Sequence, residues 1–543
     1  MKARTFLLVC VFAAALFAFD GARYLIVTAD QFETSIRPLA EWKHASGVPT
    51  HVVKLSETGS SIQDIQDYIE NAYDNWPIQP EFVLLVGHPS YLPAARYGQG
   101  GWRYYSDNYY ADMSGDLRAE LKVGRFPVRT TGQCDVMVAK TLAYERTPDM
   151  SDSLWMRRLT VIAREDYDPP DDSIYWQNVR YMASLAGAAG FVGCDSFSRA
   201  RGHTAWHVEN SVSNGTGFVM FRGSGTGNWG DPFGVNPAAC SNGEQLPVIL
   251  SVTCATMSLN PYDSMVGSAW VKAGTVGDLR GGVAFFGNTH SGMRIAQVRS
   301  SVARGFATGL FLDERFQLGD AMLRAKEQLY DEFPQESEDY RGFSLFGDPE
   351  LKMWTATPRM LDVDHPAEVL PEPQSIEVNV THNGMPIANA LVCLSMDSTV
   401  YGYQHTNGSG NVTLDVSPSD TGWMRVVVTG RNCHPYDSLI HVVTQVGISE
   451  NPPAGLPGTG FAIKARPSVF DGSTMLSFSR TLAAGSEVVM RDAAGRRVRL
   501  LHADGSGSVR WDGRDAAGAE VRAGVYFCDV PGTRTRARLT KTD

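Results

Sequence analysis

Short apolar runs rich in β-branched residues alternate with amphipathic helical segments from Tyr24 to about Pro358. The predicted strands are 24–28, 51–55, 81–86, 121–123, 159–163, 217–221, 247–252 and 282–286. The predicted helices are 34–44, 62–73, 174–186, 265–273 and 319–330. Such alternation is typical of an α/β fold in which helices cover both faces of a parallel sheet. Functional residues are then expected just beyond the C-terminal ends of the strands.

The pattern changes after Pro358. Prolines at 366, 371 and 373 mark a linker, and strand-like runs at 375–380, 390–395 and 424–428 follow it. They predict a small β-sandwich over 366–446. A second Pro/Gly-rich break at 451–460 precedes runs at 487–492, 507–511 and 524–529, which predict a last β module within 455–543. The predicted α/β domain over 24–358 is therefore followed by two small all-β modules.

The first eighteen residues have the order of a secretory signal peptide. Lys2 and Arg4 form a basic start, residues 6–17 are apolar, and Ala18 suits the cleavage position. A transmembrane anchor is disfavoured because the apolar stretch is too short to span a bilayer. The 48 Lys and Arg against 59 Asp and Glu give a net charge of -11, which would repel a nucleic acid. We therefore expect an exported protein with no transmembrane anchor and no nucleic-acid partner.

Eight cysteines are present, and Cys10 lies within the predicted signal peptide. The remaining seven are an odd number, so at least one thiol would be unpaired in an oxidising compartment. Cys393 and Cys433 lie in or beside strand-like runs of one module. They are predicted to form a disulfide.

Three segments carry candidate chemistry. A glycine-rich loop, Gly223 to Gly227, follows an apolar strand, and its glycines would let backbone N–H groups approach a ligand or an oxyanion. Cys254 ends the next strand, where it is a candidate nucleophile; a buried core thiol is the alternative. His290 follows the strand after that, and a solvated loop histidine is its alternative. A nucleotide-binding loop is disfavoured because no helix opens directly after the glycines.

An ordered set of motifs resembles the gingipain family of secreted cysteine peptidases. The set contains GFVMFRGSGTGNW at 217–229, Cys254 about thirty residues later, and FSLFGDPEL at 343–351. Supporting similarities are FVLLVG at 82–87, VGRFP at 123–127 and YERT at 144–147. The resemblance implies a caspase-like α/β fold and peptide hydrolysis through a thiolate, with no cofactor for the chemistry. Cys254 matches the nucleophile, and the backbone N–H groups of Gly225 and Cys254 match the oxyanion hole.

The sequence departs from the family at Ser224, which stands where the family has its catalytic histidine. Serine cannot titrate near neutral pH, so it cannot act as the general base or acid. His290 is the first candidate substitute and His203 the second. Glu165 resembles a family carboxylate near the catalytic histidine and could orient an imidazolium; a solvated loop carboxylate is the alternative.

Two further groups bear on binding. Where arginine-specific gingipains have a specificity aspartate, this chain has Ser173 beside Asp172, so a preference for basic side chains does not follow. Clustered carboxylates from Asp107 to Asp116 can hold a structural Ca²⁺, although the spacing is not that of an EF-hand loop and favours a polar turn.

The C-terminal modules also resemble known domains. Residues 384–414 are similar to the immunoglobulin-like domain that follows gingipain catalytic domains. The segments 488–495, 511–514 and 524–527 resemble C-terminal sorting or FlgD-like domains of bacterial surface proteins. The resemblance implies recognition by bacterial outer-surface secretion machinery and a secreted or cell-surface location. A structural spacer is the alternative.

The leading interpretation is a secreted cysteine endopeptidase that acts on proteins or peptides through Cys254 and is impaired by Ser224. One alternative is an inactive surface binding or scaffold protein that keeps the peptidase fold. Another is a sortase-like transpeptidase, because an acyl-enzyme can pass its acyl group to an amine instead of water.

Overall fold

The computed structural model describes residues 20–444 except 101–102, 293–294 and 397–398, and residues 463–542 except 479–481, 493–495, 506 and 531–535. The chain forms two compact units that divide between Val446 and Gly447. The predicted signal peptide and the break at 451–460 lie outside the described residues. No helix in the described part of the chain is long and apolar enough to cross a membrane.

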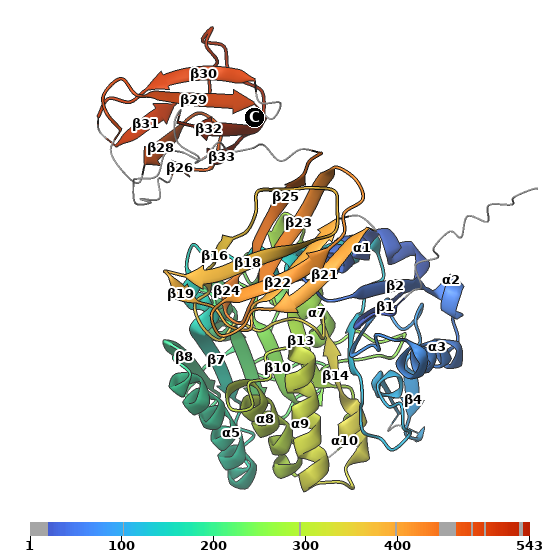
Figure 1. Ribbon diagram of the computed structural model, residues 1–543. Helices are drawn as coiled ribbons and strands as arrows, with labels where there is room; N and C mark the ends of the chain where they lie inside the picture. Colours follow the sequence, from blue (N-terminus) through green and yellow to red (C-terminus); the bar gives the residue numbers. More distant parts are fainter. Residues whose placement is uncertain are drawn as a thin grey trace, which may run out of the picture. The chain divides into compact units, whose positions relative to one another are not determined.

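A ten-stranded sheet forms the centre of the first unit (Figure 1). Its strand order is β2-β1-β3-β6-β14-β13-β10-β9-β7-β8. The strands are β1 (Tyr24–Thr28), β2 (Thr50–Lys54), β3 (Phe82–Val86), β6 (Lys122–Phe126), β7 (Arg158–Ala163), β8 (Gly193–Ser198), β9 (Phe218–Arg222), β10 (Val248–Ala255), β13 (Ala284–Asn288) and β14 (Phe343–Phe346). Neighbours from β8 to β13 are parallel, so their C-terminal ends share one edge of the sheet. β14 runs antiparallel to β13.

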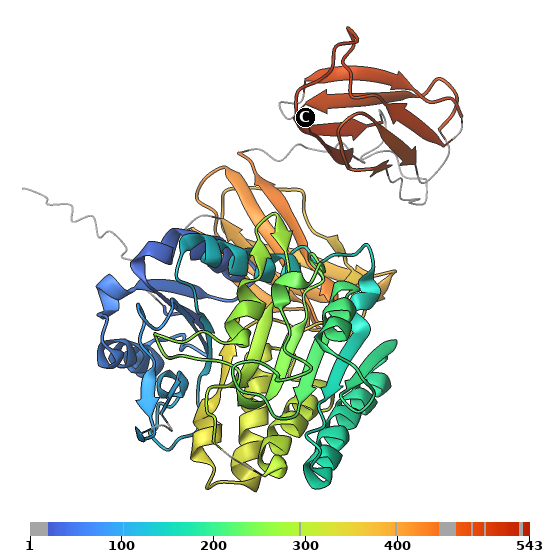
Figure 2. The same ribbon diagram turned by 180° about the vertical axis from the view of Figure 1, so that it is seen from behind.

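Helices cover both faces of this sheet. They are α1 (Glu33–Ala45), α2 (Leu55–Thr58), α3 (Ile62–Asn75), α4 (Thr131–Glu145), α5 (Pro169–Ala188), α6 (Ala205–Ser213), α7 (Val266–Lys272), α8 (Ala296–Phe311), α9 (Leu318–Glu332) and α10 (Ser337–Gly342). Figure 1 shows α5, α8 and α9 on one face, and their apolar side chains share a core with the odd-numbered residues of β7. Figure 2 shows the opposite face, where α1 and α4 pack together.

Continuous apolar runs explain why the strands could be predicted. Every residue of β1 and β3 is buried, as expected for strands that are covered on both sides. In β1, Tyr24 and Ile26 contribute to one core and Leu25 and Val27 to another. The short two-stranded pairs β4 (Ala95–Tyr97) with β5 (Tyr104–Ser106), and β11 (Gly274–Thr275) with β12 (Asp278–Leu279), lie outside this sheet.

The sequence pattern missed the helices α2, α4, α6, α8 and α10 and, within the ten-stranded sheet, the strands β8 and β14. Twelve of the sixteen residues of α8 are buried, so the helix lacks the polar stripe that makes an amphipathic pattern visible. β8 is polar and largely exposed along its length, because it is the edge strand of the sheet.

A β-sandwich completes the first unit. Its strands are β15 (Arg359–Met360), β16 (Asp362–Asp364), β17 (Glu368–Val369), β18 (Gln374–His382), β19 (Met385–Pro386), β20 (Leu391–Met396), β21 (Val400–His405), β22 (Asn411–Val416), β23 (Gly422–Thr429), β24 (Cys433–His434) and β25 (Tyr436–Val442). It packs against α1, where Trp42 and Ala45 contact Val427. The exact domain boundaries remain predictions.

The disulfide predicted between Cys393 and Cys433 is wrong, because both thiols are free. The two side chains face different surroundings. Cys433 lies in the core of the sandwich, whereas Cys393 faces α1, with its sulfur 3.9 Å from the carbonyl oxygen of His44.

The second unit is all-β. Its strands are β26 (Ile463–Arg466), β27 (Val469–Phe470), β28 (Thr474–Phe478), β29 (Glu487–Asp492), β30 (Arg497–His502), β31 (Ser508–Trp511), β32 (Gly524–Asp529) and β33 (Arg536–Lys541). They form a three-stranded and a five-stranded sheet around a core that contains Trp511 and Leu539. This is the second small β module that the sequence predicts.

Candidate active site

Cys254 lies near the C-terminal end of β10, where the strand is irregular. Ser251 pairs with Gly287 and Ala255 with Asn288, so residues 252–254 are out of register with β13. Such a bulge changes the direction in which a side chain points. It leaves Cys254 half-buried, although most of β10 is fully buried. The predicted nucleophile is therefore accessible at the edge where the sequence places it.

The glycine-rich loop after β9 is anchored beside this strand end. Thr253 Oγ1 donates to the carbonyl oxygen of Gly223 at 2.6 Å, and Gly227 N donates to the carbonyl oxygen of Ala255 at 2.7 Å. A Cβ atom on Gly225 would lie 2.7 Å from the carbonyl oxygen of Asn228, so a larger residue does not fit there. The loop can thus bring its backbone close to a substrate carbonyl, as an oxyanion hole requires.

Ser224 is exposed in this loop. Its backbone N–H donates to Asp166 Oδ2 at 3.0 Å, which ties the loop to the segment after β7. Burial raises the pKa of the nearby Tyr175, against the opposing effects of Arg222 and of a hydrogen bond with Ser224. Neither contact of Ser224, with Asp166 or with Tyr175, is with an imidazole.

Arg299, from α8, contacts the sulfur directly. Its Nη1 donates to Cys254 Sγ at 3.0 Å, its Nε to Asp339 Oδ1 at 2.9 Å, and its Nη2 to the carbonyl oxygen of Gly292 at 2.9 Å. Burial disfavours the charge, but Asp339 and Cys254 outweigh burial and raise the pKa of Arg299. Sequence reasoning missed this residue, because the only local signal was a charged residue inside a mostly buried helix.

His290 is buried and does not hydrogen-bond to Cys254. Its Nδ1 lies 3.9 Å from Asp339 Oδ2 and its Nε2 lies 3.6 Å from Glu338 Oε2. The ring packs against Tyr104, with 4.9 Å between ring centroids. His290, Tyr104 and Ala255 help to line a cavity of about 130 Å³. The structure brings His290 to the same edge of the sheet as Cys254, and its role as a base stays a prediction.

The other predicted polar residues lie apart from the sulfur. Glu165 accepts hydrogen bonds from Trp176 Nε1 at 3.0 Å and from the backbone N–H of Ala200 at 3.1 Å. Asp172 accepts from the backbone N–H of Asp166 at 2.7 Å, and Ser173 accepts from Gln177 at 3.3 Å. These contacts hold the segment around the start of α5, and a role in orienting an imidazolium or in binding substrate stays a prediction.

The second candidate base, His203, packs beside His207, with 4.9 Å between ring centroids. His203 Nδ1 accepts from the backbone N–H of Ser198 at 3.1 Å, and His207 Nδ1 accepts from that of Thr204 at 3.1 Å. Both rings therefore bind local backbone before and within the first turn of α6. No hydrogen bond joins either ring to Cys254 in the described part of the chain.

The carboxylates of the proposed calcium cluster serve other partners. Asp107 binds Arg125 through both oxygens, at 2.7 and 2.8 Å. Asp112 accepts from the backbone N–H groups of Gly115 and Leu117, at 2.7 and 2.9 Å. Asp116 accepts from that of Arg118 at 2.9 Å. These bonds are those of a polar turn and a buried ion pair.

A different acidic group lies near the sandwich. Glu145, Asp348 and Glu350 are buried, and one oxygen of each lies within 4.8 Å of the others. Lys43 occupies the space between them: its Nζ lies 2.7 Å from Glu145 Oε2, 2.7 Å from Asp348 Oδ2 and 2.6 Å from Glu350 Oε2. The ammonium group thus supplies the positive charge that a metal ion would otherwise bring.

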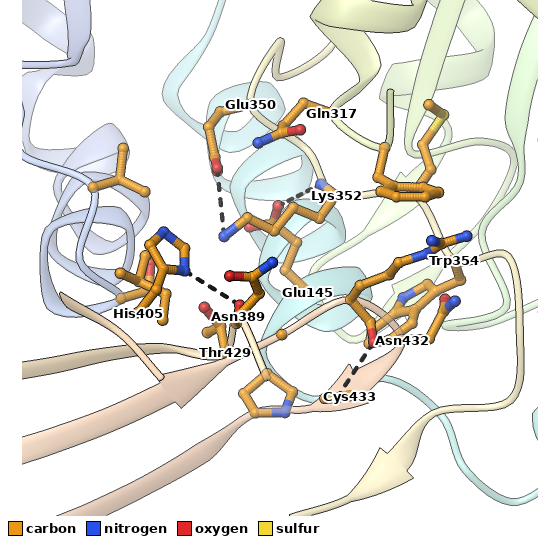
Figure 3. Close-up of a pocket in the computed structure, with 18 of the residues that line it drawn as sticks. Glu145, Gln317, Glu350, Lys352, Trp354, Asn389, His405, Thr429, Asn432 and Cys433 are labelled. Carbon is orange, nitrogen blue, oxygen red and sulfur yellow. Dashed lines mark hydrogen bonds and ion pairs between the residues drawn. The ribbon is translucent and has the colours of Figure 1, made fainter. Parts of the chain in front are cut away.

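Glu145 and Glu350 also line a cavity of about 230 Å³ between the sheet domain and the sandwich (Figure 3). Figure 3 shows Gln317, Glu350 and Lys352 on one side and His405, Asn389 and Thr429 on the other. Lys352 contributes a backbone N–H bond to Glu145 Oε1 at 3.1 Å. The sandwich residues Asn389, His405 and Thr429 line the cavity together with Glu145 and Glu350.

The protonation of Glu145 should make stability depend on pH. Burial raises its pKa from 4.5 to about 7, against the opposing effect of Lys43. A carboxyl group with a raised folded-state pKa contributes stability that is complete below its unfolded pKa and is lost as the pH rises through its folded pKa. Between pH 5 and pH 7.5 the unaltered chain should therefore lose stability relative to Glu145→Gln. Urea unfolding of both proteins across this range measures the difference, and parallel pH curves would contradict it.

Comparison with known proteins supplies the family relationships. Residues 18–354 match the family described as peptidase family C25. Gingipain R2 of Porphyromonas gingivalis is 24% identical over 441 residues, which cover 76% of this chain and 56% of that protein. Gingipain R1 of the same organism is 23% identical over 423 residues, covering 73% of this chain and 40% of that protein. The chain thus spans about half the length, or less, of these curated relatives.

Two solved structures share the fold. The crystal structure of the Arg-specific cysteine proteinase gingipain R has a TM-score of 0.71 at 20% identity, covering 78% of this chain and 98% of that one. The complex of the pro- and mature domains of the Porphyromonas gingivalis RgpB protein has a TM-score of 0.70 at 21% identity, covering 78% and 100%. These similarities confirm the predicted caspase-like α/β sheet and its resemblance to gingipains.

Proposed function

Because the chain belongs to peptidase family C25, we propose that it is a cysteine peptidase whose nucleophile is the thiolate of Cys254. Protein and peptide substrates follow from the family. Hydrolysis of peptide bonds is impaired in this member, because Ser224 occupies the position of the proton-transferring histidine.

The placement of Cys254 is the observation that carries this proposal. Its thiol is half-buried at a bulged strand end, and the backbone of the Gly225 loop is bonded to the same strand. A nucleophile next to backbone N–H donors is the arrangement that acyl transfer requires. Gly225 N–H and Cys254 N–H are the proposed oxyanion donors.

The weak point of the site is proton transfer. A peptide amine leaves readily only after it receives a proton, and general acid–base assistance contributes about 10² to 10⁴ in rate. Neither Ser224 nor Arg299 can supply that proton near neutral pH, because serine does not titrate there and arginine stays charged. Slow hydrolysis is therefore the expected behaviour.

The proposal also covers the cellular location of the protein. A basic, apolar and small-residue sequence at positions 1–18 supports export. The two β modules after the peptidase domain support display at the surface of a bacterium, with outer-surface secretion machinery as the partner of the last module.

An inactive binding protein is the second candidate, because Ser224 has no imidazole among its described contacts. Such a protein would bind peptides at the groove beside Cys254 without turning them over. The two candidates differ in whether an acyl-enzyme forms.

Cys254→Ala should abolish peptide cleavage and acyl-enzyme formation, because the attacking sulfur is lost. The purified chain is incubated with a broad peptide library, and mass spectrometry detects cleaved peptides and any acyl adduct on Cys254. Cys194→Ala is the matched control, since Cys194 is exposed on the edge strand β8, and its activity should be unchanged.

The other possible results of this experiment distinguish the alternative functions. Peptide binding without adduct or cleavage would favour the inactive binding protein. Products joined to an added amine would favour a transpeptidase. Cleavage that survives Cys254→Ala would overturn the proposed function, because the chemistry would then lie elsewhere.

A further inference from the structure

The contact between Arg299 and Cys254 places a fixed positive charge on the nucleophile. Arg299 is only 7% exposed, and it donates hydrogen bonds to Cys254, Asp339 and the backbone of Gly292. Because its Nε and Nη2 atoms are also hydrogen-bonded, the guanidinium has little freedom to rotate away from the sulfur. It can stabilise negative charge on Cys254 Sγ throughout a reaction.

Asp339 holds the guanidinium in place. Its Oδ1 accepts from Arg299 Nε at 2.9 Å and from Asn288 Nδ2 at 2.7 Å. Burial opposes ionisation of this carboxyl group, but His290 and Arg299 outweigh burial and lower the pKa of Asp339 to about 2. Asp339 is thus a carboxylate at neutral pH; Asn288, the last residue of β13, holds it by a hydrogen bond, and His290 lies 3.9 Å away.

Arg299 can stabilise negative charge on the sulfur, but it cannot transfer a proton. Arg299 can favour a thiolate, but it cannot give a proton to a leaving group because its own proton is never released in this pH range. A thiolate leaving group, with a pKa of about 8.5 for its thiol, departs without a proton. An amine leaving group must receive a proton before it departs.

Resting on the proposed function, we propose that a site with Arg299 against the Cys254 sulfur and serine in place of a proton donor at position 224 is selective for acyl thioesters over peptide amides. The acyl group is peptidyl, as the family's substrates imply, and the leaving group is a thiol. Arg299 is then a catalytic residue, since it touches the reacting sulfur. Asp339, Asn288 and His290 are positioning residues.

The reaction balances without another reagent. The Cys254 thiolate attacks the carbonyl carbon, a C–S bond to the enzyme forms, and the C–S bond to the leaving group breaks as the departing thiolate takes its electron pair. Water then attacks the acyl-enzyme, the carboxylate is released, and Cys254 returns to a thiolate beside Arg299. One turnover consumes a water molecule and releases a carboxylate, a thiolate and two protons.

The first test uses the unaltered chain and two substrates with the same peptidyl group, one a thioester and one an amide. Acceleration is kcat/KM divided by the uncatalysed hydrolysis rate. We expect the acceleration of the thioester to exceed that of the amide by about 10² to 10⁴, because only the amide needs the missing general acid. Equal accelerations would overturn the proposal. Because this test needs no variant, it holds even where a substitution prevents folding.

The second test separates chemistry from structure. Arg299→Gln should lower thioester kcat/KM about 10- to 100-fold, the effect of losing one hydrogen bond to a charged group, and should slow alkylation of Cys254 by iodoacetamide. Arg299→Lys keeps the charge and should recover part of both rates. Arg304→Gln, which removes an exposed arginine on the same helix, is the matched control and should change neither.

Failure of this proposal and failure of the proposed function give different results. Thioester cleavage that persists in Cys254→Ala would overturn the proposed function. Cleavage that depends on Cys254 but is unchanged in a folded Arg299→Gln protein would overturn only the role of Arg299.

Discussion

Ser224→His should raise the kcat/KM of peptide hydrolysis by about 10² to 10⁴, the usual contribution of general acid–base catalysis. Ser224 is exposed in a loop bonded to the strand of Cys254, so the substitution places an imidazole where the family has one without filling a buried space. The imidazole would give the leaving amine its proton. Initial rates on a fluorogenic peptide amide measure the change.

The matched control is Thr226→His, which adds an imidazole to the same exposed loop at a different position. It should leave peptide hydrolysis near the unaltered level. If Ser224→His folds but its kcat/KM for peptide hydrolysis does not rise, the absence of a histidine at position 224 is not what limits turnover. A gain that survives the added change Cys254→Ala would show that the new imidazole acts without the sulfur.

Lys43→Met should destabilise the first unit by about 3–5 kcal/mol, the cost of removing one partner from a buried ionic group. Three buried carboxyl groups would then lose the ammonium group that contacts each of them within 2.7 Å, and the remaining contact from Lys352 reaches Glu350 at 3.5 Å. Protonation could remove part of that repulsion, so the deficit should shrink as the pH falls. Chemical unfolding at pH 7 and pH 5 measures both effects.

Lys54→Met is the control, because Lys54 forms an exposed pair with Glu57, and the unfolding midpoint should hardly move. Adding Glu145→Gln to Lys43→Met should restore part of the lost stability, since it removes one of the unbalanced charges. An unchanged midpoint in Lys43→Met would mean that the buried carboxyl groups do not need their cation.

The sequence predicted the parts of the fold that local pattern controls. The strands β1 and β3 are continuous apolar runs because both faces of the sheet are covered. Such runs can be recognised from the sequence alone. The antiparallel β14 is a four-residue strand, too short for its pairing to be deduced. Its position beside β13 depends on contacts between distant parts of the chain.

The same limit applies to the site. Cys254 could be predicted as a nucleophile because a thiol at a strand end is a local signal, and Ser224 could be singled out because it interrupts a motif; both roles stay predictions. Arg299 contacts the sulfur, and Asp339 contacts Arg299, only after the chain has folded, so the local sequence around either residue does not point to the site. The incorrect disulfide has a related cause, since the facing directions of Cys393 and Cys433 depend on how the sandwich packs.

The distribution of free thiols decides where an oxidant can damage the protein. Cys134, Cys240, Cys393, Cys433 and Cys528 are buried, whereas Cys194 is exposed and Cys254 is half-buried. A solvent-borne peroxide therefore reaches Cys194 and Cys254 first, and a sulfur that is stabilised as a thiolate is the more readily oxidised to sulfenic acid. Under the proposed function, the contact with Arg299 that favours attack by Cys254 would also favour its oxidation, and a reductant that reverses the sulfenic acid would then be needed to keep the sulfur reactive.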